Sequence, residues 1–291
     1  IVIRLNKDAK GRWQVAQLPI VEAALVSISP RDGAIRALVG GFNFSRNKFN
    51  HVIQAWRQPG SSFKPFIYSA ALEKGLTPAT VINDAPLVFD AGQTGSKPWE
   101  PKNYDGTYAG PIRMRTALVK SKNLVSIRIL QTIGPRYAQD YISRFGFNPE
   151  QHPAYLTMAL GAGSVTPFQM ASAYSVFANG GYRVNPYYIE RLTDARGKVL
   201  AQANPVRAGE SAERAIDARN AFIMTSMMKD VVRFGTAARA MQLGRGDLAG
   251  KTGTTNDQVD AWFCGYNADL VAVAWIGFDQ PRSLGNGETG A

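Results

Sequence analysis

The distribution of strand and helix signals along the chain constrains the fold most. The segment EAALVSISPRDGAIRALVGG holds two runs rich in β-branched residues, and the Pro-Arg-Asp-Gly between them is typical of a hairpin turn. Three more strand candidates lie near the other end of the chain, at 251–255, 261–266 and 270–278. Strands from both ends can form one antiparallel sheet only if they pair over a long sequence separation. We therefore predict an α+β fold.

The middle of the chain has helical periodicity. Glycines stand where helix C-caps are expected, at Gly75, Gly134, Gly146 and Gly180. The helices are expected at 62–73, 112–119, 124–133, 136–145, 167–178 and 218–231. This pattern predicts an all-helical lobe at about 61–180, inserted into a sheet lobe made from about 21–60 and 181–291. We interpret residues 1–20 as the remnant of a preceding linker region.

The charge balance limits the choice of partners. The chain of 291 residues has 33 basic and 22 acidic residues, a net charge of +11, which favours an anionic partner. The basic residues are spread along the chain without an aromatic-interleaved tract, so we do not expect nucleic acid to bind. A lipid surface or a carboxylate-bearing polymer fits this balance better.

Reactive and membrane-spanning features are sparse. The longest apolar run, 270–278, has nine residues, which is too short to cross a bilayer and indicates a buried strand. The single cysteine, Cys264, cannot form an internal disulfide and reads as a small core residue. The chain opens without methionine on IVIRLNKDAKGRW, and we interpret it as part of a longer protein.

The stretch GRGDLAGKTGTTNDQ contains Gly-Lys-Thr, which occurs in nucleotide-binding loops. A Walker A loop requires a glycine five residues before Gly250, and Arg245 stands there. The following residues favour a strand, a polar turn and a second strand, whereas a phosphate loop leads into a helix. The sequence therefore does not support a nucleotide site, and this Lys-Thr-Gly is predicted to lie on a strand.

Histidine is too scarce for the commonest serine and metal chemistry. Only His51 and His152 are present, so few residues are available for a Ser-His-Asp triad or for a metal site with several histidine ligands. We expect neither a metal ion nor a cofactor. His152, in PEQHPAY, reads as an exposed turn residue. A serine nucleophile without histidine needs another base, and a lysine one helical turn away can supply it.

Ser-x-x-Lys occurs three times, and its context separates the three. SRNK from Ser45 lies in a polar connection, and SMMK from Ser226 lies well inside a predicted helix. SSFK from Ser61 follows Pro-Gly and opens a segment that is apolar on nearly all sides, where free backbone N–H groups and the helix dipole favour a developing oxyanion. Pro65 would crowd the Ser61 carbonyl, so we expect a distorted or 3₁₀-like first turn.

Two further elements complete a rarer combination. Ser121 and Asn123 lie at the junction of two predicted helices, where a hydroxyl can relay a proton and an amide can orient a lysine and a substrate peptide. Lys251-Thr-Gly-Thr follows on a strand. Each motif is weak alone, but their order along the chain is specific.

With these elements in place, the chain resembles the transpeptidase domain of class A, bifunctional penicillin-binding proteins of the larger Gram-negative type. The segments that carry the resemblance are RQPGSSFKPFIYSAALEKG, PKNYDGTYAGPIRMRTALVKSKNLVSIRI, LGAGSVTPFQMASAYSVFANGGYRVNP and DLAGKTGTTNDQVDAWFCGYN. The resemblance runs from about residue 21 to the end. It implies the penicillin-binding protein/β-lactamase-like fold, an antiparallel sheet flanked by helices.

The resemblance also implies residue roles. Ser61 would be the acylated nucleophile, Lys64 the base that activates it, Ser121 a proton relay and Asn123 its partner. Lys251 would supply positive charge. Residues 252–254 would bind the donor peptide, with Thr252 and Thr254 on its terminal carboxylate and Gly253 between them; backbone N–H groups of Ser61 and Thr254 would form the oxyanion hole.

The implied partners are peptidoglycan stem peptides and β-lactam antibiotics. Members of the larger type carry an N-terminal membrane anchor and a glycosyltransferase domain and act on the periplasmic face of the bacterial inner membrane. Neither of these parts is present in the sequence, and SLGNGETGA resembles an internal segment, so we expect a soluble fragment of such a protein.

Two other functions remain open on the motifs alone. A hydrolase, either a β-lactamase or a D,D-carboxypeptidase, would use the same nucleophile, and a non-catalytic penicillin-binding sensor needs only the acylation step. A class A β-lactamase also needs a carboxylate base between the second and third elements, and no Glu-x-x-Leu-Asn occurs there. Transfer to an acceptor amine would distinguish a transpeptidase from a sensor.

Overall fold

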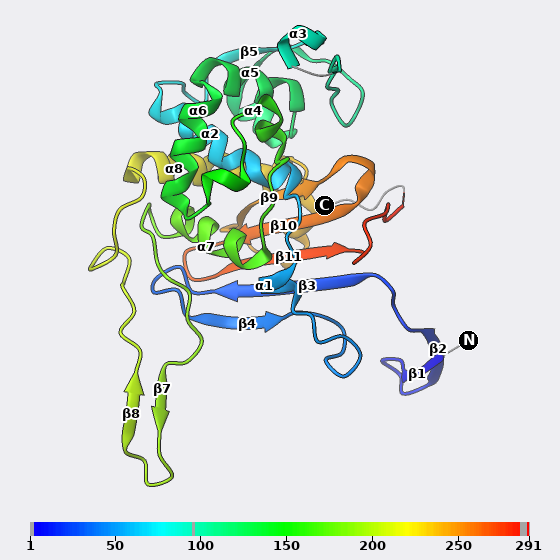
Figure 1. The fold of residues 1–291 in the computed structure, drawn as a ribbon, viewed down its shortest axis with the longest axis vertical. Helices are drawn as coiled ribbons and strands as arrows, with labels where there is room; N and C mark the ends of the chain where they lie inside the picture. Colours follow the sequence, from blue (N-terminus) through cyan, green and yellow to red (C-terminus); the bar gives the residue numbers. More distant parts are fainter. Residues whose placement is uncertain (1–2, 95–96, 286–289, 291) are drawn as a thin grey trace.

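The core of the fold is a five-stranded antiparallel sheet built from both ends of the chain (Figure 1). The computed structural model describes residues 3–94, 97–285 and 290. The strand order is β4-β3-β11-β10-β9, with β3 at Glu22–Ile28, β4 at Ile35–Val39, β9 at Ala249–Thr254, β10 at Asp260–Tyr266 and β11 at Val271–Gly277. Val26 of β3 faces Val273 of β11, both fully buried, so the long-range pairing is held by apolar packing. The predicted α+β architecture is confirmed.

The helices gather on one side of this sheet (Figure 1). They are α1 at His51–Gln54, α2 at Lys64–Glu73, α3 at Ala91–Thr94, α4 at Met114–Val119, α5 at Asn123–Ile133, α6 at Pro135–Ile142, α7 at Pro167–Ala178 and α8 at Ala218–Phe234. Helix α7 packs on β3, β10 and β11, and α8 packs on β9. Helix α2 is surrounded by α5, α6 and α8, which accounts for its apolar residues on nearly every side.

The prediction of a helix over 112–119 is wrong at its beginning. Ile112 and Arg113 belong to β6 (Gly110–Arg113), which pairs with β5 (Val81–Asp84), and α4 begins at Met114. Pro111 has no N–H to donate, and Arg113 is extended, with φ −68° and ψ 145°. Ile112 therefore packs as a strand residue opposite Ile82.

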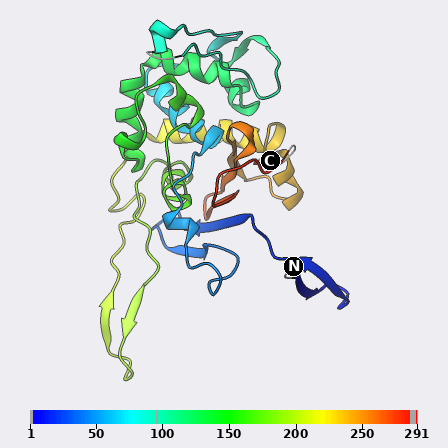
Figure 2. The same ribbon diagram turned by 45° about the vertical axis from the view of Figure 1, so that its right-hand side comes forward.

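Two hairpins that the sequence pattern did not predict project from the body of the molecule (Figure 2). One is formed by β1 (Ile3–Lys7) and β2 (Trp13–Gln17) and lies within the region read as a linker remnant. The other is formed by β7 (Arg191–Thr193) and β8 (Val199–Gln202), and all residues of its strands are exposed.

In the described part of the chain, no helix has the length and apolar character needed to span a membrane. Of the segment SLGNGETGA, residues 286–289 and 291 lie outside the described residues.

An aromatic cluster lies under the start of α2. The ring of Phe66 has neighbours at centroid distances from 4.9 to 5.5 Å, which are Phe63, Phe145, Phe147, Tyr174 and Phe177. Phe63 and Phe66 are fully buried, and Tyr174 donates a hydrogen bond of 2.6 Å to the Ser62 carbonyl. Cys264 is buried, as expected for a core residue. This tightly packed cluster supports the Ser61 turn and restricts its movement.

His152 belongs to the same cluster, and its expected place in an exposed turn is wrong. Its side chain is 1% exposed and its ring stacks on Phe63 at 4.8 Å between centroids. The Nδ1 atom is buried without a hydrogen-bond partner. Burial in this apolar environment lowers the pKa of His152 to about 4. The imidazole is therefore neutral in the folded protein at pH 7.

This burial predicts an acid-sensitive stability. The unfolded chain binds the His152 proton near pH 6.5 and the folded protein only near pH 4, so stability falls as the pH drops through this window. Between pH 7.5 and pH 4 the loss from this residue is expected to be about 3 kcal/mol of unfolding free energy. Urea unfolding of the wild type and of His152→Gln at both pH values measures it. Equal losses of stability in the two proteins would contradict the assignment.

Candidate active site

Ser61 lies in a tight turn at the base of α2. The 3₁₀ turn η1 covers Gly60–Phe63 and runs directly into α2, and the Lys64 N–H donates to the Ser61 carbonyl. The expected 3₁₀-like first turn is confirmed, and it removes the clash that Pro65 would cause in a regular α-helix. Ser61 is half-buried, and Lys64 is fully buried one turn later.

The turn lies directly against β9. Gly60 has φ +55°, and a Cβ added to it would stand 2.5 Å from the Thr254 carbonyl oxygen. A Cβ on Gly253 would stand 2.4 Å from the Pro59 carbonyl oxygen. Side chains at either position would force the Ser61 turn away from the strand, so the glycines permit this close approach of two backbones.

The segment that leads into this turn is fixed to the sheet. Arg57 and Asp260 form a salt bridge of 2.7 Å, with side chains 11% and 5% exposed. The Arg57 backbone exchanges two hydrogen bonds of 2.9 Å with Val165, and the Trp262 indole donates to the Gln58 carbonyl at 2.9 Å. The segment before Ser61 is thereby held on both sides, which favours a fixed position for the Ser61 side chain.

Ser121 occupies a backbone position that usually belongs to glycine. Helix α4 ends in a Schellman motif, in which the N–H of Lys122 donates to the Ala117 carbonyl and the N–H of Ser121 to the Leu118 carbonyl. Ser121 has φ +56°, in the left-handed region. A serine here carries a conformational cost of about 1–3 kcal/mol, which is typical of a position retained for its side chain.

Four of the predicted residues form one hydrogen-bonded cluster. Lys64 Nζ lies 2.7 Å from the Ser121 carbonyl, 2.7 Å from Asn123 Oδ1 and 3.3 Å from Ser121 Oγ. Lys251 Nζ lies 2.9 Å from Ser121 Oγ and 3.1 Å from the Thr252 carbonyl. The Ser121 hydroxyl therefore stands between the two amines, where a proton relay requires it.

The electrostatics of the cluster favour a neutral Lys64. Burial and the positive charge of Lys251 hold the pKa of Lys64 well below its usual range. Burial also lowers the pKa of Lys251 to about 7. A neutral amine has two N–H groups and one lone pair. Because two carbonyl-type oxygens take the N–H groups of Lys64, its lone pair is left to accept a proton from a hydroxyl.

The threonines of β9 lie differently from Lys251. Side chains alternate along a strand, so Thr252 and Thr254 share the face opposite to that of Lys251. The Thr252 hydroxyl forms a hydrogen bond of 2.6 Å with the Thr236 hydroxyl, and Thr254 Oγ1 accepts from the Gly290 N–H at 3.2 Å. Strand β9 is the edge of the sheet, so an extended peptide can pair with it.

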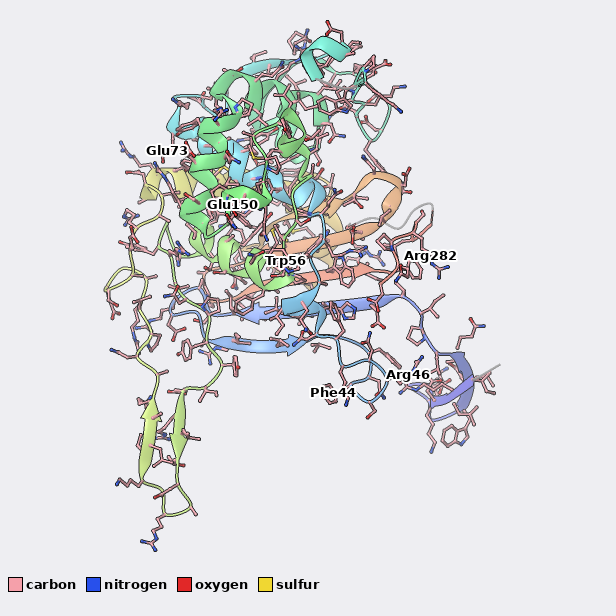
Figure 3. The ribbon with its side chains drawn as sticks, viewed as in Figure 1. Phe44, Arg46, Trp56, Glu73, Glu150 and Arg282 are labelled. Atoms are coloured by element: carbon pink, nitrogen blue, oxygen red, sulfur yellow. The ribbon has the colours of Figure 1, made fainter. Side chains whose placement is uncertain are left out.

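The two other Ser-x-x-Lys motifs lie outside this cluster. Ser45 and Lys48 are exposed in the loop after β4; the adjacent Phe44 and Arg46 are labelled in Figure 3, far from α2. Ser226 lies inside α8, as predicted, and accepts a hydrogen bond from Arg115 at 3.1 Å. Neither serine shares the environment of Ser61.

The structure adds residues to the site that motif spacing did not identify. Asn103 and the carbonyl of Lys102 both bind Asn123. Arg57 and Asp260 hold the segment that leads into the Ser61 turn. Their partners lie 20 residues or more away along the chain, so no local periodicity reveals them. Asn103 does fall within one of the segments that carry the resemblance, PKNYDG, and this is the only sequence signal for it.

Comparison with known proteins identifies the family. The family model described as penicillin binding protein transpeptidase domain matches residues 23–282. Penicillin-binding protein 1A of Neisseria gonorrhoeae is 56% identical over 284 residues, which cover 98% of this chain and 36% of that protein. The Pseudomonas aeruginosa protein of the same name is 48% identical, with 99% of this chain and 40% of that protein covered. The chain thus spans little more than a third of these relatives.

Solved structures support the same family assignment. The crystal structure of penicillin-binding protein 1A from Haemophilus influenzae superposes with a TM-score of 0.95 at 41% identity, covering 99% of this chain and 48% of that chain. PonA1 of Mycobacterium tuberculosis in complex with penicillin V gives a TM-score of 0.77 at 30% identity, covering 91% and 72%. Because the family model matches residues 23–282, which is most of the chain, the chain belongs to the penicillin-binding protein transpeptidase domains.

Proposed function

We propose that this chain is a peptidoglycan D,D-transpeptidase that cross-links stem peptides through an acyl-enzyme on Ser61 and is acylated by β-lactams. The observation that carries the proposal is the position of Ser121 Oγ, 2.9 Å from Lys251 Nζ and 3.3 Å from Lys64 Nζ. A base, a relay hydroxyl and a second amine thus meet beside the Ser61 turn. The complex of the related PonA1 with penicillin V supports the β-lactam part.

The first half of the reaction follows from the protonation of the cluster. Ser61 Oγ attacks the carbonyl carbon of the penultimate D-alanine, and Lys64 Nζ accepts the hydroxyl proton on its lone pair. The tetrahedral oxyanion is stabilised by the backbone N–H groups of Ser61 and Thr254, which the contact between Gly60 and Thr254 brings near one another. When the C–N bond breaks, the leaving D-alanine amine receives the proton through Ser121.

The second half reverses these steps with another nucleophile. An acceptor amine loses its proton to Lys64 while it attacks the carbonyl carbon of the Ser61 ester. The amide cross-link forms as the bond from the acyl carbon to Ser61 Oγ breaks, and Lys64 returns the proton to Ser61 Oγ. Lys251 provides positive charge beside Ser121. Thr252, Gly253 and Thr254 of edge strand β9, whose threonine side chains lie on the opposite face from Lys251, would receive the terminal carboxylate of the donor. No group that activates water is needed in either half.

We also propose the setting of this activity. The chain corresponds to the transpeptidase region of a bifunctional protein that carries a glycosyltransferase domain and a membrane anchor, and works on the periplasmic face of the inner membrane. Its coverage of 36% of the gonococcal relative is consistent with further domains in such a protein. Within the chain, a helical lobe at 61–180 and a sheet lobe at 21–60 and 181–291 would meet at the Ser61 turn.

Mass spectrometry tests the proposal. Benzylpenicillin is expected to add its full mass to the protein, on the peptide that contains Ser61, and the adduct should persist for many minutes to hours because no general base promotes ester hydrolysis. Given a stem peptide donor and an amine acceptor, the protein should release the joined product. Turnover of penicillin at several per second would indicate a hydrolase, and acylation without transfer would indicate a sensor.

The threonine hydroxyls of β9 give a separate prediction. The double variant Thr252→Val and Thr254→Val keeps the side-chain shape but removes both hydroxyls. Acylation by benzylpenicillin, which has a carboxylate, should fall by about tenfold or more, since each hydrogen bond to a charged group contributes about 1.5–3 kcal/mol. Thr236→Val, which removes only the partner of Thr252, controls for the lost Thr252–Thr236 bond. Unchanged acylation in the double variant would make the threonines structural.

A further inference from the structure

The orientation of the Asn123 amide is fixed from outside the three motifs. Its Nδ2 donates to the Lys102 carbonyl at 2.9 Å, and its Oδ1 accepts from Lys64 Nζ at 2.7 Å. Rotation of the amide by half a turn would place Nδ2 against Lys64 and a carbonyl against a carbonyl. The carbonyl of Lys102 therefore selects the end of Asn123 that faces Lys64.

The next residue, Asn103, holds the backbone of Asn123. Its Oδ1 accepts from the N–H groups of Asn123 and Leu124, at 2.9 and 3.3 Å. These are the first N–H groups of α5, whose N-cap residue, Lys122, makes no side-chain capping bond. Asn103 thus supplies the missing cap from a distant part of the chain, and in doing so fixes the position of Asn123.

Asn103 is itself fully bonded and buried. Its Nδ2 donates to Asp84 Oδ1 at 2.7 Å and to the Thr107 carbonyl at 2.8 Å, so both its donors and both acceptor positions are used. The side chain is 4% exposed, and Asp84 is fully buried. Lys122 Nζ lies 3.5 Å from Asp84 and 2.8 Å from Asp105, which compensates the buried carboxylate. The anchor is therefore rigid.

We propose that Asn103 is a positioning residue for acylation: by holding the start of α5 and the Lys102 carbonyl beside it, Asn103 makes Asn123 present Oδ1 and not Nδ2 to Lys64. The inference rests on the function proposed above. If Nδ2 faced Lys64, it would donate to the amine lone pair, and the base would be blocked. The effect of Asn103 thus reaches the reaction through two intervening contacts.

The proposal predicts a change in the pH profile of acylation as well as in its rate. The charged group that faces Lys64 is Lys251 of β9. An ammonium group depends on acceptors more strongly than a neutral amine does, so loss of the Oδ1 acceptor should lower the pKa of Lys64 further. In Asn103→Ala, the plateau rate should fall between about tenfold and about a hundredfold. The acid limb of the profile should move to lower pH.

Asn179 is a matched control for the loss of a fully bonded asparagine. It also donates to two carbonyls, those of Pro30 and Tyr182, and accepts from two backbone N–H groups, those of Gly181 and Tyr182. It ends α7, and none of these partners belongs to the site. Asn179→Ala should lower thermal stability without moving the acid limb.

The experiment measures second-order acylation by benzylpenicillin from pH 5 to pH 9, with intact mass as the readout and the folded fraction taken from thermal melts. If Asn103→Ala does not fold, Asn103→Ser, which removes fewer atoms, replaces it. A native plateau and acid limb in the folded Asn103 variant would overturn the inference, as would equal shifts in the Asn179 control. Failure of the wild type to be acylated would instead refute the proposed function.

Discussion

Replacement of Ser61 with alanine is expected to abolish the penicillin adduct completely. The variant lacks Ser61 Oγ, the atom that would form the covalent bond to the acyl group. The turn that holds residue 61 is formed by Gly60, Pro65 and the aromatic cluster under α2, none of which needs the Ser61 hydroxyl. Intact mass after a long incubation with benzylpenicillin measures the result, and the melting temperature should stay within a few degrees of the native value.

Ser226 and Ser45 supply the controls, because each begins a Ser-x-x-Lys sequence of the same length. Ser45→Ala and Ser226→Ala should be acylated at the native rate. A full adduct in Ser61→Ala, or its loss in either control, would assign the nucleophile elsewhere and remove the basis for the mechanism.

The substitution Lys64→Arg is expected to lower the acylation rate by about a hundredfold to ten-thousandfold, which is the contribution of a general base. A guanidinium is positively charged and cannot give up a proton near neutral pH, so position 64 would have no lone pair to accept the Ser61 proton. Lys64 is fully buried and makes two hydrogen bonds of 2.7 Å to oxygens, and the proposed function as a base depends on the lowered pKa that burial and the nearby charge of Lys251 give it.

Because a guanidinium is larger than an ammonium, the folded fraction of Lys64→Arg must be measured by circular dichroism before rates are compared. Lys229→Arg is the matched substitution, since Lys229 is the lysine of the third Ser-x-x-Lys and lies in α8, outside the cluster. Native acylation in Lys64→Arg would mean that Lys64 acts only through its charge.

Local patterns predicted much of this molecule because local forces determine those parts. The glycine stops and apolar periods indicated most helices, and the position of Pro65 was enough to predict a 3₁₀ turn at Ser61. Ile112 and Arg113 were misassigned because pairing with β5 decided their conformation, and periodicity contains no information on a partner strand. His152 was misplaced because Phe63, from a distant part of the chain, stacks on its ring, and Phe147, five residues before it, packs against it as well.

The sequence named the residues of the candidate site but not the contacts that hold them in place. The order of three motifs identified Lys64, Ser121 and Lys251, and the structure brings them together. The left-handed backbone of Ser121 and the cap that Asn103 provides depend on how α4 ends and on where residues 102–109 fold back. The Asn103 contacts join residues with no fixed spacing, and Ser121 stands where a glycine usually marks the end of a helix, so the sequence alone reveals neither feature.

The pairing of β3 with β11 has a consequence for how the protein becomes active during synthesis. Strand β3 ends at Ile28 and its partner β11 begins at Val271, and β9 carries Lys251 on the far side of β10. A ribosome adds about 5–20 residues per second, so the emerging chain waits many seconds with the Ser61 segment synthesised but its sheet incomplete. Such non-local closure is slow. Penicillin labelling of ribosome-bound chains should therefore begin only after β11 has left the exit tunnel, which makes the antibiotic a reporter of completed folding.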